Sequence, residues 1–314
     1  MRSTSSRCLA AITAAVLALT AACGSGDSSG SSDPGSGEKR TVQTPKGPVE
    51  VPAEPLRIVA IDFQIPYILL DLEAKLAGAI DLTAAKDGEP FRGLEIIGND
   101  AGELNYEAIA KADPDLVIGG DYQEAEYDQL KDRYPTVLVP AVGDEPGWKP
   151  QVRAVAEAVN KTAKLNELEA EYQDRVTELK GEHGAKLTAS KWATLGTYDG
   201  SGWYLYDKVG GPSTVLADLG IPFDEATTKV ADGNVAQYSV EQLNQLSGAQ
   251  VLLFDDLGPP VTAEGASAKL KADPLFTSLP AAQSAKVFDG QFNVIDYGDA
   301  TRVLDRLDEI LGQL

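Results

Sequence analysis

The chain is poor in the residues that build metal sites and disulfide frameworks. It has one histidine and two cysteines among 314 residues. Zinc sites in proteins usually need several histidine or cysteine ligands, so we expect no metal site and no disulfide scaffold. Basic residues are also scarce, with 27 Lys and Arg against 48 Asp and Glu, a formal net charge of −21. Such an acidic surface repels nucleic acid and anionic lipid, so we expect no nucleic-acid partner.

Sequence motifs of enzymes are missing as well. No P-loop and no histidine cluster is present, and no serine pairs convincingly with His183. The segment GDSSG at 26–30 fits a hydrolase nucleophile motif, but it lies in a Gly/Ser-rich stretch without the strand and helix that the motif requires. We therefore expect no catalytic residues, no cofactor and no enzymatic activity. An exported enzyme is the alternative from another class.

The N-terminus predicts export and lipid anchoring. Arg2 and Arg7 precede the apolar run LAAITAAVLAL and small residues before Cys23. We predict a lipoprotein signal peptide at 1–22, with Cys23 lipidated and the protein held at the extracytoplasmic face of the cell membrane. The alternative is a secretory peptide cut nearby, with a free thiol at Cys23. The Gly/Ser-rich segment 23–40 predicts a disordered tether.

Short apolar runs alternate with helical segments along the remaining chain. RIVAID, LAGAID, DLVIGGD and TVLVPAV come first, and KWATLGTY, AQVLLFDD and KVFDG follow a long helical stretch. This alternation predicts an α/β fold in which parallel sheets carry helices on both faces. We expect two Rossmann-like lobes, at 41–160 and 184–314, joined by one long α-helix at 161–183. The segment TVQTPKGPVEVP predicts a short hairpin before the first lobe.

An aromatic segment, YDGSGWYLY at 198–206, follows one of the second lobe's strands. Ligands of α/β folds bind beyond the carboxyl ends of the strands, so this segment belongs near a cleft between the lobes. If WYLY is a strand, Trp203 faces one side and Tyr204 the other. One face then packs in the core, and we expect Tyr198 and Trp203 to contact a ligand.

The order of these segments resembles the substrate-binding proteins of ABC importers for ferric siderophores, haem and cobalamin. The resemblance covers 41–311 and rests on RIVAID, NYEAIAKADPDLVIGG, the single long helix, VLADLGIPF, YSVEQLNQLSGAQVLLF and DPLFTSLPAAQSAKVF. It implies a monomer with two lobes on a rigid helix, little hinge motion and a shallow aromatic cleft. It also implies an ABC permease dimer as the partner, with presentation of the ligand to a membrane sensor as a further possibility.

Two glutamates match the family's permease-docking pattern. Glu107 stands in N-Y-E and Glu241 in S-V-E, one in each lobe and each near the start of a helix. The resemblance implies that both reach arginine pockets of the permease. The alternative is that Asn105 and Ser239 are N-caps and that the glutamates only favour the positive helix ends.

The ligand that we expect is an Fe(III)-siderophore, with haem or cobalamin as alternatives. The loop GNDAGEL carries no basic residue, so a triply charged catecholate meets an unfavourable potential and a neutral or cationic hydroxamate complex is favoured. Lys86 and Arg92 argue against this if their loop reaches the cleft. The candidate ligand-binding residues, each of which has a cap or turn role as its alternative, are Asp62, Phe63, Asn99, Asp100, Tyr122, Trp148, Tyr198, Trp203, Tyr204, Asn234 and Phe292.

The single histidine, His183, is placed at the end of the long helix. A cation stabilises a helix C-terminus, and no second histidine is present to complete a metal site, so we expect a structural role.

Overall fold

We analysed a computed structural model that describes residues 37–85, 88–99, 101–140, 147–233 and 235–314. Residues 37–314 form one compact unit. It begins with an antiparallel hairpin of β1 (Lys39–Thr44) and β2 (Gly47–Pro52), as predicted, although β1 starts inside the segment expected to be a tether. Within the described residues, no helix is both long and apolar enough to span a bilayer.

The first lobe is built on a five-stranded parallel sheet in the order β5-β4-β3-β6-β7. The strands β6 and β7 are buried along their whole length, which explains their continuous apolar sequences. The strands are β3 (Ile58–Ala60), β4 (Leu76–Ile80), β5 (Glu95–Gly98), β6 (Leu116–Gly120) and β7 (Thr136–Val139). The helices are α1 (Ile65–Asp71), α2 (Tyr106–Ala112), α3 (Glu124–Leu130), α4 (Lys149–Ala158) and the 3₁₀ turn η1 (Glu89–Phe91).

The second lobe contains a mixed sheet in the order β10-β9-β8-β11-β12. The strands β8 (Trp192–Gly196), β11 (Val251–Asp255) and β12 (Val287–Gly290) are parallel, as expected. In contrast to the expected parallel sheet, β9 (Gly202–Tyr206) and β10 (Val235–Ser239) run antiparallel. The connection from β8 to β9 spans only residues 197–201, which is too short for a parallel crossover.

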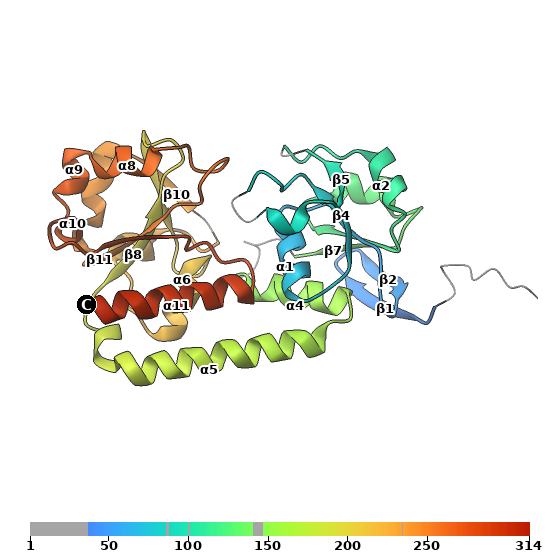
Figure 1. Ribbon diagram of the computed structural model, residues 1–314, viewed down its shortest axis with the longest axis horizontal. Coiled ribbons are helices and arrows are strands. Elements are labelled where there is room, and N and C mark those ends of the chain that lie inside the picture. Colours follow the sequence, from blue (N-terminus) through green and yellow to red (C-terminus); the bar gives the residue numbers. More distant parts are fainter. Residues whose placement is uncertain (1–36, 86–87, 100, 141–146, 234) are drawn as a thin grey trace, which may run out of the picture. The chain divides into compact units, whose positions relative to one another are not determined.

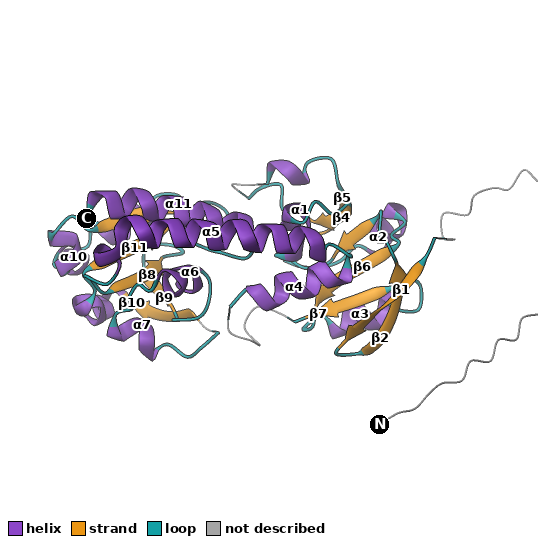
Figure 2. Cartoon of the chain, turned by 90° about the horizontal axis from the view of Figure 1, so that it is seen from below, coloured by secondary structure: helices purple, strands orange, loops and turns teal. Residues whose placement is uncertain are grey.

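Helices surround this second sheet and complete the lobe (Figure 2). They are α6 (Pro212–Leu219), α7 (Glu225–Lys229), the 3₁₀ helix η2 (Val240–Gly248), α8 (Ala266–Lys271), α9 (Pro274–Thr277), α10 (Pro280–Gln283) and α11 (Tyr297–Gln313). The predicted two-lobed α/β fold is therefore confirmed.

The long helix α5 (Thr162–Leu187) follows α4 and leads into the second lobe. Its helical backbone is interrupted at Gly184, one residue after the end of the predicted helix at 161–183. Figure 1 shows α11 lying alongside α5, and both helices contribute buried side chains to one hydrophobic cluster.

That cluster, which we call the shared core, extends through both lobes. It includes Ile58 and Leu116 from the first sheet, Trp192 and Val251 from the second, and Tyr172 of α5. Each lobe also has a smaller core of its own on the other face of its sheet. The two lobes are thus parts of one packed body rather than independent domains on a linker.

Candidate binding site

A cavity of about 940 Å³ lies between the two lobes, which is within the size range of small-molecule sites. We call it the interlobe cavity. The first lobe lines it with Phe63, Gln64, Tyr67, Asp81, Leu82, Ala84, Ala85, Ile96, Gly98, Asn99, Glu103, Leu104 and Asn105. The second lobe contributes Leu257, Pro259, Pro260, Val261, Gln291, Asn293, Ile295, Asp299 and Arg302.

The loop after β3 presents Phe63 to this cavity, while Asp62 holds the loop in place. The buried Asp62 carboxylate accepts hydrogen bonds from the backbone N–H groups of Gln64 (2.6 Å) and Ile65 (2.9 Å). The Tyr122 hydroxyl donates to the same carboxylate at 2.5 Å. The Tyr122 pKa is raised mainly by burial and to a smaller extent by this hydrogen bond. Asp62 therefore has the turn role that we gave as an alternative, and it positions its neighbour Phe63.

The loop after β5 is ordered by Asn99. Its side-chain oxygen accepts from the backbone N–H groups of Ala101 (3.0 Å) and Glu103 (2.9 Å), and its amide nitrogen donates to the Glu103 carboxylate at 2.8 Å. Asn99 and Glu103 both line the interlobe cavity. Asn99 thus combines a turn role with a place at the site.

In the second lobe, the fully buried Asp255 fixes the loop that follows β12. Its carboxylate accepts from the backbone N–H of Phe292 at 2.7 Å and from the Tyr206 hydroxyl at 2.7 Å. Burial raises the pKa of Asp255, and the hydrogen bond from Tyr206 opposes this shift. Because Phe292 is anchored in this way, its neighbours Gln291 and Asn293 reach the interlobe cavity.

Arg302 is the one basic side chain among the described residues that line the cavity. Its Nη2 atom lies 2.6 Å from Asp299 Oδ1, so the guanidinium is neutralised by an acid of the same lining. Asp81 and Glu103 add two further carboxylates, and hydrogen bonds from the Thr83 hydroxyl and backbone N–H lower the pKa of Asp81. The described lining is therefore net acidic.

The aromatic strand β9 is buried on both faces, in contrast to the predicted division into a core face and a ligand face, and the ligand assignment does not match the cavity. Trp203 is 2% exposed, stacks on Tyr238 and donates its indole N–H to the Ser239 carbonyl at 3.0 Å. Tyr204 is buried on the opposite face, with its ring 4.8 Å from that of Tyr198. Tyr198 is 46% exposed but lies outside the described lining of the interlobe cavity.

Two further candidates belong to the shared core, which corrects their expected position at the cleft. Trp148 is fully buried at the start of α4 and packs edge-on against Tyr172 and Tyr297, with ring centroids 6.4 and 4.7 Å away. Phe292 is also fully buried, and only its neighbours in the chain reach the cavity. Large aromatic side chains bury much apolar area, and here that area is buried in the core rather than against a ligand.

Several predictions fall on residues outside the described part of the chain. These are Cys23 and the signal peptide, Lys86, Asp100 and Asn234.

Comparison with known proteins identifies the family. The model of the periplasmic binding protein family matches residues 59–294. The chain belongs to this family of substrate-binding proteins.

Individual relatives of this binding protein agree with that assignment. The probable siderophore-binding lipoprotein YfiY of Bacillus subtilis is 36% identical over 180 residues, a match that spans 54% of this chain and about half (53%) of YfiY. The iron(3+)-hydroxamate-binding protein YxeB of the same organism is 27% identical over 95% of this chain and 93% of its own length.

A solved structure shares the fold of the binding protein. The siderophore periplasmic binding protein from the fuscachelin gene cluster of Thermobifida fusca superposes with a TM-score of 0.71 at 24% identity. The match covers 84% of this chain and 99% of that one.

The two glutamates predicted to dock a permease lie on the surface of the binding protein. Glu107 is exposed in the first turn of α2, and Asn105 caps this helix by accepting from Glu107 N and Ala108 N at 3.1 Å each. Glu241 is exposed in the first turn of η2, which follows Ser239. The capping role of Asn105 is confirmed and is compatible with docking by its neighbour.

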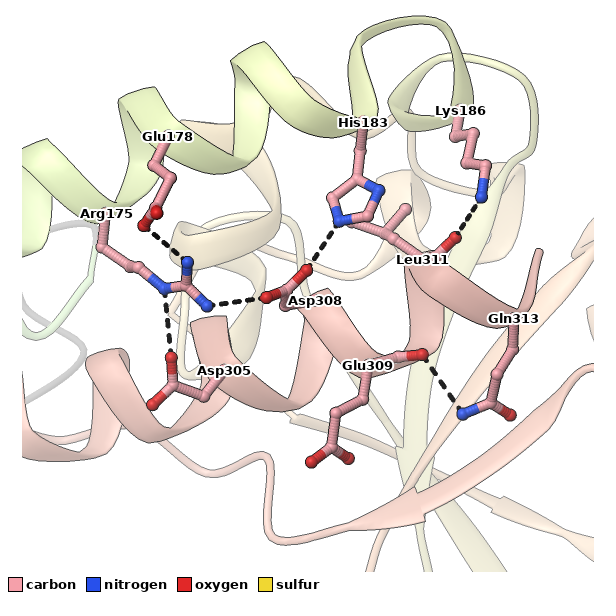
Figure 3. A network of polar contacts seen from close by, with 9 residues as sticks. All are labelled: Arg175, Glu178, His183, Lys186, Asp305, Asp308, Glu309, Leu311 and Gln313. Atoms are coloured by element: carbon pink, nitrogen blue, oxygen red, sulfur yellow. Dashed lines mark hydrogen bonds and ion pairs between the residues drawn. The ribbon is translucent and has the colours of Figure 1, made fainter.

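His183 pairs with an acid on α11 of the binding protein (Figure 3). Its Nε2 atom lies 2.7 Å from Asp308 Oδ1, and Arg175 Nη2 lies 2.8 Å from the other oxygen of the same carboxylate. Glu182, His183 and Asp308 could together offer metal ligands, but the guanidinium of Arg175 already neutralises Asp308. The contacts describe a link between helices, consistent with a structural role.

Several of the lining residues carry no sequence signal of a binding site. Pro259, Pro260 and Val261 follow β11, where a cleft loop was expected, but none of the three has an aromatic ring or a polar side chain that would indicate a ligand contact. Asp299 and Arg302 lie in a helix whose amphipathic pattern explains them as exposed charges.

Proposed function

We propose that this binding protein is a lipid-anchored extracytoplasmic receptor that captures an Fe(III)-siderophore and delivers it to an ABC permease dimer. The observation that carries the proposal is the interlobe cavity, whose described lining is apolar and neutral polar apart from three carboxylates and one paired arginine. A bulky chelate needs such a roomy site with dispersed hydrogen-bonding groups rather than metal ligands.

The charge of the lining favours a hydroxamate complex over a catecholate complex. Hydroxamates neutralise Fe(III) without excess charge, whereas tris-catecholate complexes are strongly anionic and are repelled by a net acidic cavity. The name of YxeB, an iron(3+)-hydroxamate-binding protein, points in the same direction.

Isothermal titration of the purified protein tests the ligand. We expect saturable binding of ferrioxamine, much weaker binding of a ferric tris-catecholate, and recovery of the chelate unchanged. Iron-free desferrioxamine is the matched control. Tight binding of haem or cobalamin instead would favour the alternative ligands, and a changed chelate would favour an enzyme.

Delivery is tested separately with the docking glutamates. We expect Glu107→Ala and Glu241→Ala to leave chelate affinity unchanged but to lower iron uptake in cells, most strongly when combined. Glu225→Ala, which removes an exposed acid from α7, is the control. Uptake at the normal rate in the double variant would contradict the docking role.

Anchoring is tested at Cys23. We expect Cys23→Ser to abolish incorporation of a labelled fatty acid and to release the protein from the membrane. Labelling that persists in this variant would rule out Cys23 as the anchor.

A further inference from the structure

The interlobe cavity contains one arginine among its described residues, and the guanidinium of that arginine donates hydrogen bonds to other groups of the protein. Arg302 Nη2 donates to Asp299 Oδ1 at 2.6 Å and to the Asn293 carbonyl at 3.3 Å, while Nη1 donates to the Gln291 carbonyl. Its side chain is nevertheless 42% exposed at the cavity. A guanidinium in this position would attract an anionic ligand if its charge were free.

Asp299 is held in place to neutralise that charge. It lies in the first turn of α11, its backbone N–H donates to Asp296 Oδ1 at 2.8 Å, and its Oδ2 atom accepts from the Ile295 N–H at 3.3 Å. The carboxylate can therefore contact Arg302 without swinging out of the lining. The remaining charges of the described lining are the carboxylates of Asp81 and Glu103.

We propose that Asp299 sets the charge selectivity of the cavity by neutralising Arg302. The site then selects neutral or cationic ferric chelates over anionic chelates of the same shape. This inference rests on the proposed function and names the residue that decides which chelates are accepted. Without the Asp299 charge, Arg302 would balance one of the two remaining carboxylates and the penalty on anionic ligands would fall.

A series of probes on one chelate isolates charge from shape. Ferric desferrioxamine B carries a pendant ammonium group, its N-acetyl derivative is neutral there, and its N-succinyl derivative is anionic. Isothermal titration of the wild-type protein should rank their affinities from cationic to anionic. In Asp299→Asn, which keeps an acceptor for the Ile295 N–H, we expect the cation-to-anion affinity ratio to fall about tenfold.

Two variants separate this effect from a general change in the fold. Asp305→Asn removes the same charge from the same helix at a position outside the cavity lining. The cation-to-anion affinity ratio of this variant should therefore equal that of the wild type. Arg302→Gln should shift the ratio in the opposite direction, and Asp299→Asn with Arg302→Gln should return it toward the wild-type value. The selectivity should also weaken with salt, which a purely steric role would not produce.

The outcomes distinguish this inference from the proposed function. If the wild type binds the chelates but Asp299→Asn leaves their ratio unchanged, or changes it no more than Asp305→Asn does, the selectivity role of Asp299 is wrong and the receptor function stands. If the wild type binds none of the three chelates, the proposed hydroxamate function fails, and the inference fails with it.

Discussion

Carboxylates gather where α1 of the first lobe meets the start of α11. Asp71 Oδ2 accepts from the backbone N–H of Gly298 at 3.2 Å, so a side chain of one lobe contributes to the N-terminal cap of a helix in the other. Asp296, 6% exposed, is the N-cap residue of the same helix. Burial and the nearby Asp299 raise the Asp296 pKa to about 8, and burial also raises the pKa of Asp71.

This arrangement predicts a loss of stability as the pH rises from the ordinary carboxyl pKa of 3.8 to about 8. The folded protein holds a proton on Asp296 that the unfolded chain releases near pH 3.8, so the stabilisation is complete below that value and is lost as pH rises toward about 8. Asp296→Asn keeps the capping acceptor without the titration. Chemical unfolding measures the free energy of unfolding at each pH. We expect this free energy to fall across the window by roughly 1 to 3 kcal/mol less in the variant than in the wild type. Parallel pH profiles would contradict the prediction.

The two aromatic residues first expected to contact a ligand should differ sharply in their effect on stability. Trp203 is buried in the core of the second lobe, whereas Tyr198 is 46% exposed. We expect Trp203→Ala to lower the free energy of unfolding by about 3–5 kcal/mol and Tyr198→Ala by less than about 1 kcal/mol. Denaturant titrations of the two variants measure this, and similar losses would mean that Trp203 is not a core residue.

At the scale of elements, α11 is held to α5 by charges as well as by apolar packing (Figure 3). Arg175 contacts Glu178, Asp305 and Asp308, and Lys186 donates to the Leu311 carbonyl at 2.7 Å. Asp308 also pairs with His183, so each of its two carboxylate oxygens has a partner. This network fixes the last turns of α5 against the second lobe.

Asp308 should therefore matter more than its neighbour Asp305. Hydrogen bonds from His183 and Arg175 lower the Asp308 pKa, so its contribution is present above the ordinary carboxyl pKa and is lost as pH falls through the depressed value. We expect Asp308→Asn to cost about 1 kcal/mol at neutral pH and Asp305→Asn, whose side chain is 61% exposed, less than about 0.5 kcal/mol. Thermal unfolding at neutral and acidic pH measures both, and equal costs would argue against the two-sided contact.

At the scale of the whole molecule, the shared core couples the unfolding of one lobe to that of the other. Side chains from both sheets, from α5 and from α11 belong to one cluster, so neither lobe can lose its packing without exposing apolar area of the other. This packing is consistent with the limited hinge motion that the family resemblance implies. It also places both walls of the interlobe cavity on one rigid support.

We accordingly expect the protein to unfold in a single transition, although chains of this size often unfold in steps. Tryptophan fluorescence and far-UV circular dichroism should give coincident denaturation curves. Fluorescence reports on packing around Trp148 and Trp192 in the shared core and around Trp203 in the core of the second lobe. Circular dichroism reports on the secondary structure of both lobes. Two separated transitions would show that the lobes are independent.

The features that were predictable from the sequence are those set by local chemistry. Asn105 before an apolar-periodic segment predicts a cap, and RIVAID predicts a buried strand, because neighbours in the chain decide both. Asp299 and Arg302 are three positions apart on α11, so their pairing is local as well, but its place at the cavity depends on where the start of α11 meets the first lobe. Trp148 has the composition of a ligand contact, and only the packing of Tyr172 and Tyr297 around it shows that it is core.

The contact between Asp71 and Gly298 also bears on how the protein reaches this structure. The two residues are 227 positions apart, and α11 follows every strand of both sheets in the chain. A nascent chain that has emerged only through the first lobe lacks the helix that completes its core, so its apolar surface stays uncovered during synthesis. Closing so long a loop is slow, so we expect the first lobe to reach its final packing only after α11 is available.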